Sequence, residues 1–83
     1  MTEYIVEITL LAESMTKDFV VPASMQVGEL ALLSSQAFCA LTSSRYLPSA
    51  NPILTLAGTG AVLDPDRVIQ ETEIRHGTRL LLY

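Results

Sequence analysis

The residues of this chain that are best suited to chemistry are one cysteine, one histidine and a group of carboxylates. A cysteine nucleophile needs a neighbouring histidine, but Cys39 falls in a helical segment and His76 in a predicted turn far along the sequence. A lone cysteine also provides neither a disulfide nor a thiolate cluster for a metal ion. We therefore predict no nucleophilic site, and no role for Cys39.

The carboxylates Asp64, Asp66, Glu71 and Glu73 lie close together in the sequence. Acid–base catalysis would require desolvation or a charged partner for them, and carboxylates in a turn are usually solvated. The Asp64-Pro65-Asp66 turn also offers too few oxygen ligands for a divalent cation and lacks the spacing of an EF-hand. We expect no enzymatic activity, no metal and no cofactor.

The glycines of Gly58-Thr59-Gly60 are predicted to form a tight turn. A phosphate-binding loop would need a GxGxxG pattern, or a following lysine and hydroxyl residue, with a helix behind it. None of these is present in the sequence. A turn between two short strands is the better interpretation.

Length and charge place further limits on function. The 83 residues fit one domain, 1–83, and 49% of them are apolar, which leaves either a dense core or an exposed contact patch. The net charge is −4 and the five basic residues are dispersed, so nucleic acid is not an expected partner. No apolar run approaches the roughly 20 residues of a membrane span, and Glu3 and Glu7 stand where a secretion signal would carry basic residues. We expect a cytoplasmic protein that does not insert into the membrane.

One segment, Gln26 to Thr42, has a helical pattern, with either Ser24 or Gln26 as its cap. Small and apolar residues recur in it at spacings of three and four, which predicts a buried stripe: Val27, Leu30, Ala31, Ser34, Ala37, Phe38 and Leu41. Leu32, Ser35 and Cys39 fall outside this stripe. The stripe must pack against a sheet.

Four segments alternate as half-buried strands do. They are 4–11, with Tyr4, Val6, Ile8 and Leu10 inward; 17–21, with Phe19 and Val21 inward; 53–57, with Leu54 and Leu56 inward; and 79–83, with Leu80 and Leu82 inward. Residues 12–16 are predicted to reverse the first hairpin, Pro22 to close its second strand, and 61–63 to add a short fifth strand. Val68, Ile69 and Ile74 are expected to close one end of the core, and 45–52 to form an ordered loop.

Hairpin, helix, hairpin and final strand are the element order of a β-grasp, an α+β fold. In this fold the last strand lies parallel to the first within a mixed sheet of four to five strands, and one helix packs on one face. Three stretches resemble ubiquitin: Val21-Pro22-Ala23-Ser24, Leu54-Thr55-Leu56-Ala57-Gly58, and Ile74 followed by Gly77-Thr78-Arg79-Leu80-Leu81-Leu82. The resemblance covers nearly the whole chain and implies a ubiquitin-like domain.

The C-terminus departs from ubiquitin and from the sulfur-carrier proteins, which end in a flexible Gly-Gly tail that is activated at its carboxylate. This sequence ends at Tyr83, inside the final predicted strand, and Lys17 is its one lysine. A ubiquitin-like modifier or sulfur carrier is therefore the disfavoured alternative, and it stays open if the chain is processed or extended.

A ubiquitin-like protein of this length without that tail resembles the YukD/EsaB group, the small cytosolic accessory proteins of bacterial type VII (WXG-type) secretion systems. The shared features are Val21-Pro22 before the helix and a closing Gly-x-x-Leu strand, here Gly77 to Leu80. The resemblance implies a non-enzymatic protein-interaction module whose partner is a membrane component of the secretion machinery.

The open face of the sheet is the predicted protein-binding site, because one helix covers only the other face. Alternation places Ile5, Ile53, Thr55, Leu81 and Tyr83 on this open face. In the resemblance to ubiquitin, Thr55 and Tyr83 look like the counterparts of two apolar anchors of its recognition surface, and the threonine argues against ubiquitin's own readers. A homodimer through this face and a binding site around Leu32 are the alternatives.

Overall fold

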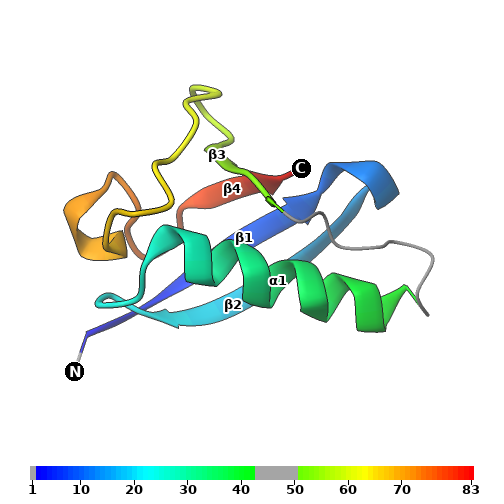
Figure 1. Cartoon of the computed structure of the whole chain (residues 1–83), viewed down its shortest axis with the longest axis horizontal. Coiled ribbons are helices and arrows are strands. Elements are labelled where there is room, and N and C mark those ends of the chain that lie inside the picture. Colours follow the sequence, from blue (N-terminus) through cyan, green and yellow to red (C-terminus); the bar gives the residue numbers. More distant parts are fainter. Residues whose placement is uncertain (1, 43–50) are drawn as a thin grey trace.

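The computed structural model of the protein describes residues 2–42 and 51–83. In chain order they form the elements β1 (Glu3–Leu10), a 3-10 helix (Leu11–Glu13), β2 (Met15–Pro22), α1 (Val27–Leu41), β3 (Leu54–Leu56), a second 3-10 helix (Ile69–Glu71) and β4 (Arg79–Leu82). The strands make one sheet in the order β2-β1-β4-β3, and α1 crosses one face of it (Figure 1). Because β4 pairs in parallel with β1 and antiparallel with β3, the predicted α+β β-grasp is confirmed. The predicted loop at 45–52 lies outside the described residues as far as residue 50.

The core lies between α1 and the sheet, and the strand alternation explains it. The fully buried apolar side chains are those predicted to face inward: Val6, Ile8, Leu10, Val27, Leu30, Phe38, Leu54, Ile69, Ile74, Leu80 and Leu82. Phe19 is half-buried and meets Phe38 edge-on, with ring centroids 5.8 Å apart. Ile69 and Ile74 are completely buried within this core, which confirms the prediction that they close one end of it.

The buried face of α1 is rotated from the predicted stripe. Leu41 was expected inside but is 50% exposed, whereas Ser35 and Thr42 are buried. Each residue turns the helix by about 100°, so the contact moves round α1 toward Ser35 and Thr42 along its length. A twisted sheet beneath a straight helix has this effect. Cys39 also packs partly against the core instead of standing clear of it.

The first reversal and the predicted fifth strand differ from the structure, and the other strand ends shift by about one residue. The first reversal needs only residues 11–14, with Ser14 in a left-handed conformation (φ 49°), so β2 begins at Met15 and pairs with β1 through Leu10. The expected strand at 61–63 is not formed among the described residues. This segment makes a single bridge between Val62 and Thr55, because the glycine turn and Pro65 on either side leave too little extended chain for a ladder.

The N-terminus of α1 is capped by a loop. Gln26 occupies the cap position, but in the described part of the chain backbone carbonyls take the place of a side-chain cap. The amides of Val27 and Gly28 donate to the carbonyls of Arg67 and Pro65, both at 2.9 Å. A Cβ at Gly28 would lie 3.1 Å from both the Cβ and the carbonyl oxygen of Pro65, so glycine permits this close approach. The loop thereby satisfies two of the helix's unpaired amides.

Candidate protein-interaction surface

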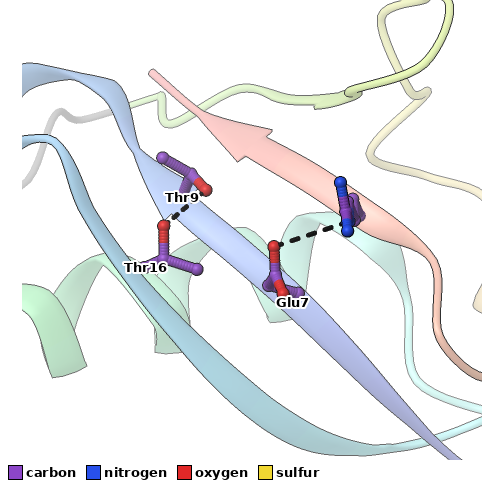
Figure 2. A network of polar contacts seen from close by, with 4 residues as sticks. Glu7, Thr9 and Thr16 are labelled. Atoms are coloured by element: carbon purple, nitrogen blue, oxygen red, sulfur yellow. Dashed lines mark hydrogen bonds and ion pairs between the residues drawn. The ribbon is translucent and has the colours of Figure 1, made fainter.

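The face of the sheet opposite α1 carries a polar band across its middle. Glu7 on β1 lies beside Asp18 on β2 and Arg79 on β4, and in the next row Thr9 lies beside Thr16. Figure 2 shows the two contacts within the band: an ion pair between Glu7 Oε1 and Arg79 Nε at 3.7 Å, and a hydrogen bond between the Thr9 and Thr16 hydroxyls at 2.8 Å. Both charged side chains are well exposed to solvent, so the ion pair contributes little stability. The band chiefly makes this part of the face hydrophilic.

On the β3 side of the band lies an apolar area that we call the C-terminal patch, formed by Ile53, Val62, Leu81 and Tyr83. Three of these side chains are strongly exposed, Ile53 by 46%, Val62 by 69% and Tyr83 by 54%, while Leu81 is half-buried. The Tyr83 amide donates to the Ile53 carbonyl at 2.9 Å, which extends the β3–β4 pairing to these two residues. An apolar centre bordered by polar residues is the composition of a protein contact site.

Thr55 does not contribute an exposed side chain to this patch, contrary to prediction. Its side chain is on the expected face, but only 3% of the residue is accessible. Thr55 pairs with Leu81 on one side and bridges to Val62 on the other, so its side chain is flanked on both sides by apolar side chains. It offers almost no surface to a partner.

Ile5 is exposed but lies apart from the other predicted residues. It pairs with Val20 of β2, and the polar band separates this pair from the C-terminal patch. Ile5 and Thr9, the β1 residue that pairs with Leu81, are four positions apart, or about 13 Å along a strand. The structure thus brings together Ile53, Leu81 and Tyr83, and leaves Ile5 at the other end of the face.

Two exposed residues were missed by the sequence reasoning. Val62 is the most exposed member of the patch, and Val20, at 63%, is the partner of Ile5. Val20 lies between Phe19 and Val21, which were predicted to face inward, and Val62 lies in the predicted strand 61–63 next to Leu63, which packs against the core. Alternation therefore places both residues on the open face.

Other kinds of site find little support in the described residues. Across 2–42 and 51–83 there is no group of three or more histidine, cysteine or acidic side chains placed to hold a metal ion. Asp64 instead accepts a bond from the Asp66 amide at 2.9 Å, which is the predicted turn chemistry. Nor does any helix in these two ranges combine the length and apolar character that a membrane-spanning helix requires.

Comparison with known proteins gives matches at the level of structure. No family model and no curated protein matches the sequence. Among solved structures, the EccD5 ubiquitin-like domain from Mycobacterium xenopi is similar over 100% of this chain and 94% of its own, with a TM-score of 0.75 and 19% identity. A chain of the MycP5-free ESX-5 inner membrane complex is similar over all of this chain but only 21% of its own length, with a TM-score of 0.73 and 17% identity.

A third similar structure comes from a different setting. A chain in the toluene 4-monooxygenase HD complex with 4-bromobenzoate matches over 98% of this chain and 96% of its own, with a TM-score of 0.79 and 11% identity. Identities this low show a shared fold and leave activity open. Together with the strand order and the single helix across the sheet, these similarities show that the chain has the ubiquitin-like β-grasp fold.

Proposed function

We propose that this protein is a non-enzymatic interaction module that acts in the cytoplasm with membrane components of a bacterial type VII secretion system, in the manner of the YukD/EsaB group. The observation that carries the proposal is the similarity of the whole chain to the EccD5 ubiquitin-like domain. The related fold in a chain of the ESX-5 inner membrane complex supports a membrane-associated partner.

The C-terminal patch is the surface proposed to make this contact. Ile53, Val62 and Tyr83 expose large apolar side chains next to one another, which costs free energy in water unless a partner covers them. Tyrosine is also enriched among the residues that dominate binding energy at interfaces. The polar band limits the contact on one side, so we expect a partner that covers the β3–β4 half of the face.

The test is affinity capture from the native host with two matched double variants. Leu81→Ser with Tyr83→Ser removes two apolar side chains from the C-terminal patch. Ile5→Ser with Val20→Ser removes two from the other end of the same face. Circular dichroism must first show that both variants are folded, because Leu81 and Ile5 lie within strands.

We expect the parent and the Ile5/Val20 variant to retain membrane subunits of the secretion system, and the Leu81/Tyr83 variant to lose them. Equal retention by both variants would contradict the assignment of the patch. Capture without any secretion component would contradict the secretion role. An added mass on the protein after incubation with host extract and ATP would instead support the alternative of a ubiquitin-like modifier.

A further inference from the structure

A cavity of about 520 Å³ adjoins the C-terminal patch. It lies between the N-terminal half of α1 and the segments 51–54 and 62–66, and its lining includes Leu32, Ile53 and Val62. Leu32 is 47% exposed although it lies on the core helix. Because Ile53 and Val62 also belong to the C-terminal patch, one apolar surface continues from the open face of the sheet round to α1. The volume is in the usual range for pockets that bury a ligand group.

The border of this cavity is acidic. Glu29 in the first turn of α1 and Asp66 in the capping loop both line it, and no lysine or arginine does so among the described residues. Within that part of the chain neither carboxylate forms an ion pair, in contrast to Glu7 on the sheet. Both carboxylates are exposed, so they stay hydrated until a cation approaches. The charges therefore complement an occupant that is apolar at its centre and positive at its ends.

We propose that the cavity receives an apolar side chain from a basic peptide segment of the partner, with lysine or arginine residues on both sides facing Glu29 and Asp66. This inference rests on the proposed interaction role and specifies the chemistry of the partner. A small cationic molecule would leave the adjoining patch uncovered, whereas a peptide can continue across Ile53 and Val62. A second copy of this chain is disfavoured by its net charge of −4.

The test titrates two short peptides into the ¹⁵N-labelled protein and follows the NMR chemical shifts of its backbone amides. The probe is acetyl-Lys-Leu-Phe-Leu-Lys-amide, and acetyl-Glu-Leu-Phe-Leu-Glu-amide is the control with the same apolar centre. We expect the basic peptide to cause saturable shifts at Gly28, Leu32 and Leu63, which line the cavity. Equal binding of the acidic peptide, or shifts confined to other surfaces, would overturn the proposal.

Matched variants separate the cavity from general charge attraction. Glu29→Gln with Asp66→Asn should weaken binding of the basic peptide about fivefold and reduce its salt dependence, which is the scale expected for exposed ion pairs. Asp18→Asn with Glu73→Gln removes the same charge away from the cavity and should leave the affinity within about twofold. Equal weakening by the two pairs would show attraction to net charge and overturn the site.

The peptide titration needs no secretion component, so its outcome is independent of the capture experiment. Failure of peptide binding with intact capture of membrane subunits refutes the cavity and leaves the proposed function standing. Localised peptide binding without secretion components in the capture refutes the secretion role and leaves the cavity as a site for basic segments.

Discussion

Replacing Thr55 by valine is expected to stabilise the protein. Thr55 is 3% exposed in the middle of β3, between Leu81 and Val62. Its hydroxyl oxygen is buried and has no hydrogen-bond partner among the described residues. Valine has the same branched shape and also favours strands, so it fills the site without burying an unpaired hydroxyl.

The size of the effect follows from the cost of the unpaired group. A buried polar group without a partner costs about 1 to 3 kcal/mol. Thr55 lies on the open face of the sheet and keeps 3% of its surface accessible, so we expect the lower end, a gain of about 1 kcal/mol in the free energy of unfolding. For a domain of this size that gain corresponds to a rise of roughly 4 to 8 °C in melting temperature.

Thermal and urea unfolding followed by circular dichroism measure this difference. Thr9→Val is the matched control, because the Thr9 hydroxyl lies on the same face but shares a hydrogen bond with Thr16 at 2.8 Å. The control should gain nothing, since it breaks a bond that is made. An equal gain in both variants would show that strand preference alone is responsible, and a loss at Thr55 would show that its hydroxyl is satisfied.

Four further substitutions test the packing of α1. Leu30→Ala or Phe38→Ala should lower the free energy of unfolding by about 2 to 5 kcal/mol, and a urea midpoint equal to the parent's would refute the helix phase. Gly28→Ala should cost about 1 kcal/mol in the same assay in spite of its better helix propensity, because the new Cβ crowds Pro65; a more stable variant would show that the capping loop yields easily. Leu32→Ser should melt within a few degrees of the parent because this side chain is 47% exposed, and loss of folding would mean that other residues pack over it.

The fold was predictable because its two periodicities are distinct. Alternation in the strands and the three-and-four spacing in α1 identified the elements and nearly all inward residues. The helix phase was less accurate, because the predicted stripe included Ser34 correctly but also Leu41, and left Ser35 outside. Ser34 and Ser35 are buried with their hydroxyls bonded to the carbonyls of Leu30, at 2.7 Å, and Leu32, at 2.9 Å. A serine that satisfies its hydroxyl within the helix is buried at little cost, and composition does not reveal this.

The candidate surface was predictable only in part. Alternation shows which face a residue occupies, but the register between strands decides its neighbours. The register sets Ile5 beside Val20 and Leu81 beside Thr9, which splits the predicted site into two ends. The burial of Thr55 depends on the side chains beside it on β4 and on segment 61–63. That segment comes back to β3 only through the turn at 58–60. A single sequence provides neither the register between strands nor the burial of Thr55.

The loop at 64–67 connects the stability of the domain to its candidate site. The Pro65 carbonyl caps the Gly28 amide, while the Asp66 carbonyl accepts a bond from the Gln26 side chain at 3.4 Å. Pro65 and Asp66 also line the cavity, opposite Leu32 on α1. A change that moves this loop therefore exposes the helix N-terminus and reshapes the cavity together. Substitutions that test binding must for this reason alter the exposed carboxylates and leave the capping backbone in place, which is why Asp66→Asn is a sounder probe than any change at Pro65.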